Sequence, residues 1–327
     1  MSTRFELLKH WLCDVLGANE FELKPASEDA SFRSYYRLFL HDKTFIVMDA
    51  PPPHEDCNPF VNVTNTLMAC DVNVPAIHKL DLGQGFLLLD DFGDDLYLDK
   101  LDSLSANKLY TDAIFTLVRM QALADVKEID SYDEPLLRRE MMLFTEWLLD
   151  KHLKIELNEE QTNSMASLFN TLVENALQQP QTFVHRDFHS RNLMITKTNN
   201  PGVIDYQDAV KGPISYDLVS LLKDCYIKWS QDEINGWIDF YINQLGEQEI
   251  EIDRQQFQRW FDLMGVQRHL KASGIFARLS HRDGKHEYLK DIPRTLSYIV
   301  DLKGEYEELT QLCSLLEQHI LPKLEVA

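Results

Sequence analysis

Basic residues are scarce in this sequence: 32 lysines and arginines stand against 53 aspartates and glutamates, a formal net charge of −21. Nucleic-acid binding requires a basic surface that neutralises phosphates, so we expect no nucleic-acid partner. Glycine and proline are also few, with 12 of each, while hydrophobic residues make up 44% of the chain. That composition excludes a disordered chain and indicates a globular protein of 327 residues with a substantial core.

Paired cysteines and long apolar runs are missing as well. The five cysteines are scattered and include no CxxC pair, which argues against a zinc knuckle or a disulfide framework and fits a reducing, cytoplasmic environment. The N-terminal stretch MSTRFELLKHWLCDVLG carries charges at Arg4, Glu6 and Lys9, so it lacks the apolar centre of a signal peptide. No apolar run reaches the length that spans a bilayer, and we therefore expect no membrane partner.

The first part of the chain favours strands. Phe5, Leu8 and Leu12 form one helical stripe, and Gly17 stands at the expected C-cap. After this helix, the runs SFRSYYRLFL-HDK-TFIVMDA and VPAIHKLD-LGQG-GFLLLDD each predict a hairpin, with a short helix in NPFVNVTNTLMAC between them. We predict a strand-rich lobe with a leading helix over residues 1–91.

Helical periodicity dominates from Ser103 onward, in segments such as SANKLYTDAIFTLVRMQALAD and EEQTNSMASLFNTLVENAL. One polar hairpin is the exception, because NLMIT, the turn KTNNPG and GVIDY predict two short strands. The second predicted lobe covers residues 92–327 and is mainly helical. A small sheet-rich lobe followed by a large helical lobe indicates an α+β fold with two lobes.

The stretch FVHRDFHSRNLM sets His185, Asp187 and Asn192 in the order H-x-D-x(4)-N, and Asp205 follows in GVIDYQDA. Phosphoryl transfer from a nucleotide needs a carboxylate to accept the hydroxyl proton and oxygen ligands to hold Mg²⁺ on the phosphates. Alternating apolar residues anchor the predicted hairpin in the core, so we expect Asn192 and Asp205 at the same edge of it. This spacing predicts a phosphoryl-transfer site.

A metal pair is the alternative interpretation of the same stretch. His185 and His189 lie four residues apart, which would suit two metal ligands on one helix. Phe188 and the strand-like run after Asn192 argue against a helix here, and no HExxH or HxHxDH motif supplies a third ligand. The metal pair is the weaker interpretation.

Together these features resemble the protein-kinase-like fold, specifically the small-molecule kinases of the aminoglycoside phosphotransferase and choline kinase branch. The sequence IDYQDA in place of D-F-G points to that branch, and the resemblance covers nearly the whole chain in lobe order. The resemblance implies ATP and Mg²⁺ as cofactors. It also implies Asp187 as the catalytic base, Asn192 and Asp205 as Mg²⁺ ligands, and His185 as a structural residue of the loop.

The predicted nucleotide lobe departs from the protein-kinase pattern, which has a glycine-rich loop and a strand lysine. Its first turn, SEDASFRSYYR, has no glycine; Ser31 would let backbone N–H groups approach phosphate, and Arg33 would supply charge. The strand FIVMDA offers Met48 where the lysine is expected. The connector LLLDDFG would bind adenine through the backbone of Leu89, Asp90 and Asp91.

Two other functions stay open. A decayed nucleotide site would make the chain a non-catalytic nucleotide-binding protein, although intact Asp187, Asn192 and Asp205 favour an enzyme. A kinase of a cationic substrate, such as an aminoglycoside or choline, would need an acidic groove. The overall charge permits such a groove, while the arginine-rich late segment argues against it.

Segments along the whole chain narrow the resemblance, among them DASFRSYYR, IVMDAPPPHED, GFLLLDDFGD, RREMMLF and GPISYDLVSLLKDCYIKW. They look like the bacterial N-acetylmuramate/N-acetylglucosamine anomeric kinases of cell-wall recycling, in which Met and Asp in place of the strand lysine are normal. The resemblance implies phosphorylation of an amino sugar at its anomeric hydroxyl, which gives the sugar 1-phosphate. The sequence does not give the oligomeric state, and we favour a monomer.

An N-acetylated sugar acid presents hydroxyls, an amide and a carboxylate, and an arginine fork binds a carboxylate through two parallel hydrogen bonds. The segments LLRRE and QRHLK to FARLSHRDGK form a local basic cluster in an otherwise acidic chain. Charged helical residues more often form a solvated face. Against that alternative, we predict substrate-binding roles for Arg138, Glu140, Tyr216, Arg268, His269 and Arg278.

Overall fold

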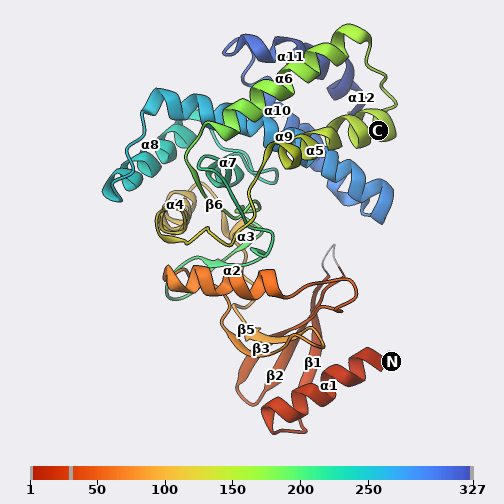
Figure 1. Ribbon diagram of the computed structural model, residues 1–327, viewed down its shortest axis with the longest axis vertical. Coiled ribbons are helices and arrows are strands. Elements are labelled where there is room, and N and C mark those ends of the chain that lie inside the picture. The colour runs from red at the N-terminus through yellow and green to blue at the C-terminus, as the bar shows by residue number, and fades with distance from the viewer. Residues whose placement is uncertain (1–2, 29–31, 325–327) are drawn as a thin grey trace. The chain divides into compact units, whose positions relative to one another are not determined.

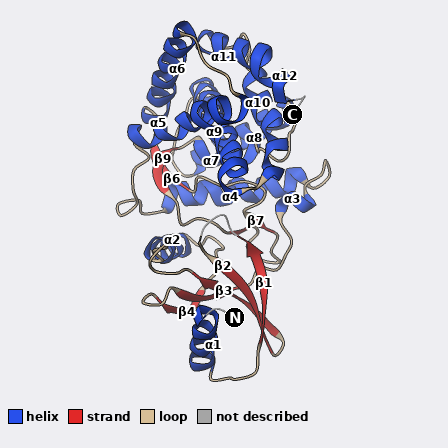
Figure 2. Ribbon diagram, turned by 90° about the vertical axis from the view of Figure 1, so that its right-hand side faces the viewer, coloured by secondary structure: helices blue, strands red, loops and turns tan. Residues whose placement is uncertain are grey.

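The protein is described by a computed structural model that covers residues 3–28 and 32–324. It divides into two compact units: unit 1 comprises Met1–Leu96 and Leu193–Asp208, and unit 2 comprises Tyr97–Asn192 and Ala209–Ala327. Figures 1 and 2 show that unit 1 holds the main sheet and that unit 2 is mostly helical. The α+β fold with a strand-rich and a helical part is confirmed.

Unit 1 is built on a five-stranded antiparallel sheet with strand order β1-β2-β3-β5-β4. Both predicted hairpins, and the helix between them, are present. The elements of the unit are α1 (Thr3–Leu16), β1 (Glu22–Glu28), β2 (Ser34–Leu40), β3 (Lys43–Asp49), α2 (Asn58–Ala69), β4 (Ile77–Asp81), β5 (Phe86–Asp90), β7 (Leu193–Met194) and β8 (Gly202–Val203).

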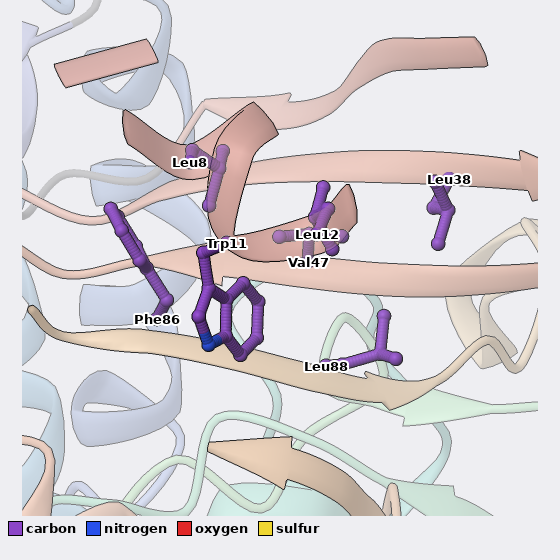
Figure 3. Close-up of a cluster of buried hydrophobic side chains, with 7 residues drawn as sticks. All are labelled: Leu8, Trp11, Leu12, Leu38, Val47, Phe86 and Leu88. Carbon is purple, nitrogen blue, oxygen red and sulfur yellow. The ribbon is translucent and has the colours of Figure 1, made fainter. Parts of the chain in front are cut away.

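Helix α1 covers one face of this sheet (Figure 3). The helix ends as predicted at Gly17, whose φ of +62° suits glycine and whose N–H donates to Cys13 O at 3.0 Å. Alternate residues of β2, β3 and β5 face α1, because successive strand side chains point to opposite faces. The buried cluster consists of Leu8, Trp11, Leu12, Leu38, Val47, Phe86 and Leu88.

Strand β1 was not predicted, because the run ELKPASE contains Pro25 and shows no clear alternation. The structure places β1 at an edge of the sheet, with a register shift between Pro25 and Ser27. An edge strand tolerates proline because one side of its backbone has no partner strand. Pro25, which has no amide hydrogen, and the register shift therefore lie at an edge of the sheet, where a backbone hydrogen bond between strands can be lost.

The polar hairpin predicted after the H-x-D-x(4)-N motif is confirmed. Strands β7 and β8 are antiparallel, and Leu193 pairs with Val203. Backbone bonds tie the hairpin into unit 1: Val203 N donates to Asn73 O and Ile195 N to Asp95 O, each at 2.8 Å. Although it lies late in the sequence, the hairpin belongs by its contacts to the strand-rich unit.

Unit 2 is a helical body with one small antiparallel pair, β6 with β9. Among the described residues, no helix is both long and apolar enough to cross a bilayer. The elements are α3 (Tyr97–Lys100), α4 (Ala106–Leu123), α5 (Glu134–Leu143), the π-helix η1 (Phe144–Leu153), α6 (Glu159–Leu177), β6 (Gln181–Val184), β9 (Val210–Pro213), α7 (Tyr216–Leu222), α8 (Gln231–Glu247), α9 (Arg254–Asp283), η2 (His286–Asp291), α10 (Ile292–Val300), η3 (Glu307–Leu309), α11 (Thr310–Leu315), η4 (Leu316–Ile320) and α12 (Leu321–Leu324).

Helix α9 runs through the middle of the other helices of unit 2 (Figure 2). Asp253 caps its first turn by accepting from Gln256 N at 2.7 Å. Most residues from Phe257 to Ser280 are buried, including the basic part of the helix. Because a buried charge needs a partner, the basic residues of α9 mark places where unit 2 must supply carboxylates or bind an anion.

Helix α9 also packs very closely on η1. A Cβ placed on Gly274 would lie 2.5 Å from the carbonyl oxygen of Leu143 and 2.6 Å from the nitrogen of Phe144. Only glycine therefore allows the two backbones this separation. The close contact fixes the buried central part of α9 against the helix pair α5–η1.

Candidate active site

The 185–192 loop connects β6 to β7 and carries the H-x-D-x(4)-N motif. His189 N donates to Asp187 O at 3.0 Å, and Asn192 N donates to His189 O at 2.9 Å. The Asn192 side chain also donates from Nδ2 to Asp187 O at 3.0 Å. His185 is fully buried, and its Nδ1 accepts from Asp187 N at 3.3 Å. These bonds fold the loop into consecutive turns around Asp187.

Two buried aspartates fasten this loop to helix α7. Asp217 accepts from His185 N at 2.6 Å and from Arg186 N at 3.0 Å. Asp224, just beyond the helix, accepts from Ser190 N at 3.0 Å and Ser190 Oγ at 2.5 Å. Sequence reasoning missed both residues. The available signal was two acidic residues in the apolar run GPISYDLVSLLKDC, since buried carboxylates must serve specific donors.

The charge state of Asp187 is set by opposing effects. Burial alone would raise the pKa of this carboxyl, but nearby cations, Lys271 foremost and then Arg268 and Arg186 among others, lower it to about 2. Asp187 is therefore ionised at neutral pH and is a weak base. Such a group accepts a hydroxyl proton only as that hydroxyl forms its new bond.

Glu140 holds two of those cations in place. It binds Arg186 Nη2 and Tyr132 OH through short hydrogen bonds, and its Oε1 lies 3.1 Å from Lys271 Nζ. Lys271 Nζ also donates to Tyr216 OH at 3.0 Å. Burial favours the neutral acid, yet Lys271 and Arg186 lower the pKa of Glu140 overall. The predicted substrate residues Glu140 and Tyr216 are thus buried and bonded to protein side chains.

Arg268 is buried on α9 and has few partners. Its Nη1 faces the sulfur of Cys225 at 3.8 Å, and within residues 3–28 and 32–324 its Nε has no hydrogen-bond partner. The Nδ1 of His189 is buried and unpartnered in the same sense. Buried polar groups without partners are rare, and such a group beside a reactive carboxylate is suited to a ligand.

The other predicted substrate residues have different surroundings. His269 bonds to Lys223 O at 2.9 Å and stacks on Tyr298, and burial lowers its pKa to about 3, so its ring is neutral. Arg138 donates to Glu134 Oε1 at 2.7 Å and to Asn170 Oδ1 at 2.6 Å. Arg278 is partly buried, which lowers its pKa. Of the predicted arginines, Arg268 is the one placed near Asp187.

The residues predicted to bind phosphate lie in unit 1. Arg33 pairs with Glu55 at 3.1 Å, and Ser31 lies outside the described residues. Met48 is buried in β3, and its neighbour Asp49 accepts from Arg4 Nε of α1 at 2.7 Å. The strand position where a protein kinase has its lysine thus lies beside an ion pair between the sheet and the leading helix.

The predicted adenine connector also lies in unit 1. Leu89 and Asp90 end strand β5, and Asp90 Oδ2 accepts from Ala76 N at 3.1 Å. Asp91 follows the strand and pairs with Arg37 Nε of β2 at 2.7 Å. Arg37 also lies 2.8 Å from Asp94. These pairs fix the conformation of the connector against β2.

The two predicted Mg²⁺ ligands fall in different units. Asn192 is the last residue of its segment of unit 2, and Asp205 follows β8 in unit 1. Asp205 is exposed and has a φ of +65°, a left-handed conformation that is uncommon for residues other than glycine and frequent at functional sites. Amide and carboxylate oxygens are hard ligands of the kind that Mg²⁺ prefers, so these residue types fit the ion.

A pH dependence of activity follows from Asp217. Burial raises its pKa to about 6, so below that pH its carboxyl gains a proton and accepts less well from His185 N and Arg186 N. We expect kcat/KM to fall roughly fivefold between pH 6 and pH 5 if only the ionised form holds the loop, because the ionised fraction of a group with this pKa falls by about that factor. A profile that stays flat down to pH 5 would contradict this role.

Unfolding would not explain that loss. The folded-state pKa of Asp217 lies above the value of about 3.9 for an unfolded chain, so the native state binds more protons between these values. This group therefore makes the fold more stable, not less, as the pH falls from about 6 to about 4. Melting temperatures recorded beside the rate profile separate the two effects.

Comparison with known proteins confirms the family. The chain matches the family model described as "Phosphotransferase enzyme family" over residues 22–257. It is 45% identical over 298 residues to an N-acetylmuramate/N-acetylglucosamine kinase of Pseudomonas putida, a match that covers 90% of this chain and 88% of that protein. The kinase of the same name from Pseudomonas aeruginosa is 43% identical over 325 residues, 96% of both chains.

Solved structures agree at the level of fold. The choline kinase LicA from Streptococcus pneumoniae superposes with a TM-score of 0.63 at 13% identity, over 91% of this chain and 100% of that chain. The resemblance to small-molecule kinases predicted from the loop motif and the lobe order is confirmed. Because the family model spans well over half of its length, the chain belongs to the phosphotransferase enzyme family.

Proposed function

We propose that this phosphotransferase transfers phosphate from ATP to the anomeric hydroxyl of N-acetylmuramate and N-acetylglucosamine. The observation that carries the proposal is the identity, over nearly the full length of both chains, with kinases that bear the names of these two sugars. The product is a sugar 1-phosphate. The reaction takes place in the cytoplasm, on a monomer, and serves the recycling of cell-wall sugars.

The 185–192 loop supports this chemistry. Asp187 accepts the hydroxyl proton while the hydroxyl attacks the terminal phosphate, and its low pKa makes it a weak base. An anomeric hydroxyl is more acidic than an ordinary alcohol, so it needs less help from the base. A weakly basic carboxylate therefore suits this acceptor in a loose transition state, where proton transfer comes late.

Asn192 and Asp205 are the proposed Mg²⁺ ligands. Strand β7 begins directly after Asn192, β8 ends two residues before Asp205, and the antiparallel pairing of Leu193 with Val203 joins those ends of the strands. When bound, the ion neutralises charge on the nucleotide phosphates. For the nucleotide itself, we assign phosphate contacts to Ser31 and Arg33 beside Met48, and adenine contacts to the backbone of Leu89, Asp90 and Asp91.

For the sugar, Arg268 is the principal candidate among the predicted residues. It is buried near Asp187, and its Nε has no hydrogen-bond partner among the described residues, so it suits a hydroxyl or the transferred phosphoryl group. Glu140 and Tyr216 act through Arg186 and Lys271, which they position. Direct contacts of Arg138, His269 and Arg278 with the sugar stay predictions.

The charges around Asp187 weigh against a cationic acceptor. Lys271, Arg268 and Arg186 all lie close enough to lower its pKa, and Glu140 is already bonded to two of them. An aminoglycoside or choline would bring further positive charge into this cluster, at an electrostatic cost. A neutral or anionic sugar avoids that repulsion.

A blocked sugar tests the anomeric assignment. The methyl glycoside of N-acetylglucosamine lacks the free hydroxyl at carbon 1 and keeps every other group, so we expect no phosphate transfer to it. Free N-acetylglucosamine should give a product whose ³¹P signal couples to the anomeric proton. Phosphorylation of the methyl glycoside would place transfer elsewhere on the ring. Phosphorylation of kanamycin and of neither sugar would overturn the proposed substrate class.

A further inference from the structure

Arg191 is an exposed arginine of the 185–192 loop that is held between two tyrosine rings. The guanidinium carbon lies 4.7 Å from the centre of the Tyr226 ring and 5.7 Å from that of Tyr288. Tyr226 follows helix α7, and Tyr288 lies in η2. The two rings thus come from different parts of unit 2 and restrict the guanidinium to one region of the surface.

The two tyrosines belong to a larger aromatic cluster. Phe276 of α9 stacks on Tyr288 with ring centres 5.7 Å apart, and its ring centre lies 6.3 Å from that of Tyr226. His189 of the same loop contacts Tyr226 edge-on at 5.6 Å. An arginine side chain that already packs on aromatic rings loses little further conformational entropy when it binds a ligand. The aromatic cluster therefore preorganises the guanidinium of Arg191 for binding.

Among the described residues, Arg191 has no carboxylate ion-pair partner, whereas several other arginines of unit 2 have one. Arg186 pairs with Glu140, Arg259 with Glu308 and Arg294 with Asp291. Within the described part of the chain, no carboxylate forms an ion pair with Arg191; Asp291 is near enough to interact with its charge, but pairs with Arg294. In a protein with a net charge of −21, an oriented and exposed guanidinium without a carboxylate is suited to bind one from a ligand.

The position of Arg191 relates it to the acceptor. Arg191 is the fourth residue after Asp187, and the bonds from His189 N to Asp187 O and from Asn192 N to His189 O keep the segment compact. In the proposed reaction, Asp187 accepts the proton of the hydroxyl at carbon 1. A group elsewhere on the same small sugar therefore lies in the neighbourhood of the loop's other side chains.

We propose that Arg191 binds the lactyl carboxylate that N-acetylmuramate has and N-acetylglucosamine lacks. This inference rests on the proposed function. It makes Arg191 a specificity residue: its guanidinium forms the two-pronged hydrogen bond to the carboxylate, and Tyr226 and Tyr288 hold the fork in place. Arg268, buried beside Asp187, contacts what the two sugars have in common.

The test compares the two sugars in one set of variants. For Arg191→Gln, we expect kcat/KM for N-acetylmuramate to fall about 10- to 100-fold, as for loss of a charge-assisted hydrogen bond, and kcat/KM for N-acetylglucosamine to stay within about twofold. Arg191→Lys keeps the charge without the fork and should fall in between. Arg268→Gln should lower kcat/KM for both sugars alike.

Arg259→Gln is the matched control, because Arg259 also lies over a tyrosine ring, that of Tyr306, but pairs with Glu308. It should change neither sugar's kinetics. The methyl ester of N-acetylmuramate removes the charge from the sugar instead of from the protein. Arg191→Gln should therefore not lower kcat/KM for this ester any further. Melting temperatures show whether a variant is folded, and calorimetry with each sugar gives binding directly.

Equal losses for both sugars in Arg191→Gln, or no loss for either, would overturn the specificity role while leaving the proposed function intact. A loss with N-acetylmuramate that persists unchanged for its methyl ester would also overturn it, since the carboxylate would then not be the group bound. Failure of the unmodified protein to phosphorylate either sugar is a different result: it would remove the proposed function itself.

Discussion

Replacing Asp187 with asparagine is expected to lower turnover by about two to four orders of magnitude, as for loss of a positioned base. The variant keeps the shape of the side chain, and the loop keeps its bonds from Asn192 and to Asp217 and Asp224. Nucleotide binding and the melting temperature should therefore change little. Single-turnover kinetics with the sugar, together with calorimetry for the nucleotide, measure the two parts separately.

Asp125→Asn serves as the control for that experiment, because Asp125 is exposed and pairs with Lys127 on the surface of unit 2. It should have wild-type turnover. Near-normal turnover in Asp187→Asn would remove Asp187 from the mechanism. Loss of nucleotide binding in the same variant would instead indicate that the substitution disturbs the loop.

Removing the carboxylate of Asp205 is expected to abolish Mg²⁺-dependent binding of ATP, because this group is the proposed charged ligand of the ion on the phosphates. Two variants are needed, since Asp205 has a positive φ that alanine adopts less readily than asparagine. Asp205→Asn keeps the backbone preference and removes the charge, whereas Asp205→Ala removes the whole group. Asn192→Ala should weaken binding less, because an amide oxygen carries no full charge.

Calorimetry with ATP, in the presence of Mg²⁺ and of a chelator, gives the readout. Asp42→Ala, in the exposed turn between β2 and β3, is the control within unit 1 and should bind as the wild type does. If Mg·ATP binds equally well to the wild type, Asp205→Asn and Asp205→Ala, the assignment of this carboxylate to the metal is wrong.

Much of the fold could be predicted because local patterns and turn residues agree with the tertiary structure. The leading helix with its stop at Gly17, both hairpins of unit 1 and the hairpin after Asn192 all carry strong periodicity or turn signals. Strand β1 carries neither, since Pro25 breaks its pattern and its place at the sheet edge depends on β2. Strand β1 forms because it pairs with β2, and its own local sequence does not show that pairing.

The site was predictable only in part, for a related reason. The spacing of His185, Asp187 and Asn192 is local, so the sequence displays it. The residues that hold the loop are far away in sequence, and Asp217 and Asp224 look like ordinary helical aspartates until their burial is known. For the basic residues of α9, a solvated face was the alternative to substrate binding, and it is wrong for Arg268 and Lys271, which lie inside unit 2.

The fastening of the 185–192 loop to α7 has a consequence for its motions. The backbone amides of His185, Arg186 and Ser190 donate to the buried carboxylates of Asp217 and Asp224. Their protons therefore cannot exchange with solvent until these hydrogen bonds break. Local opening of this loop therefore costs about as much as opening the buried helix beside it. In hydrogen exchange, the segment that carries the chemistry should behave as part of the slowest-exchanging core, although it has neither helical nor strand conformation.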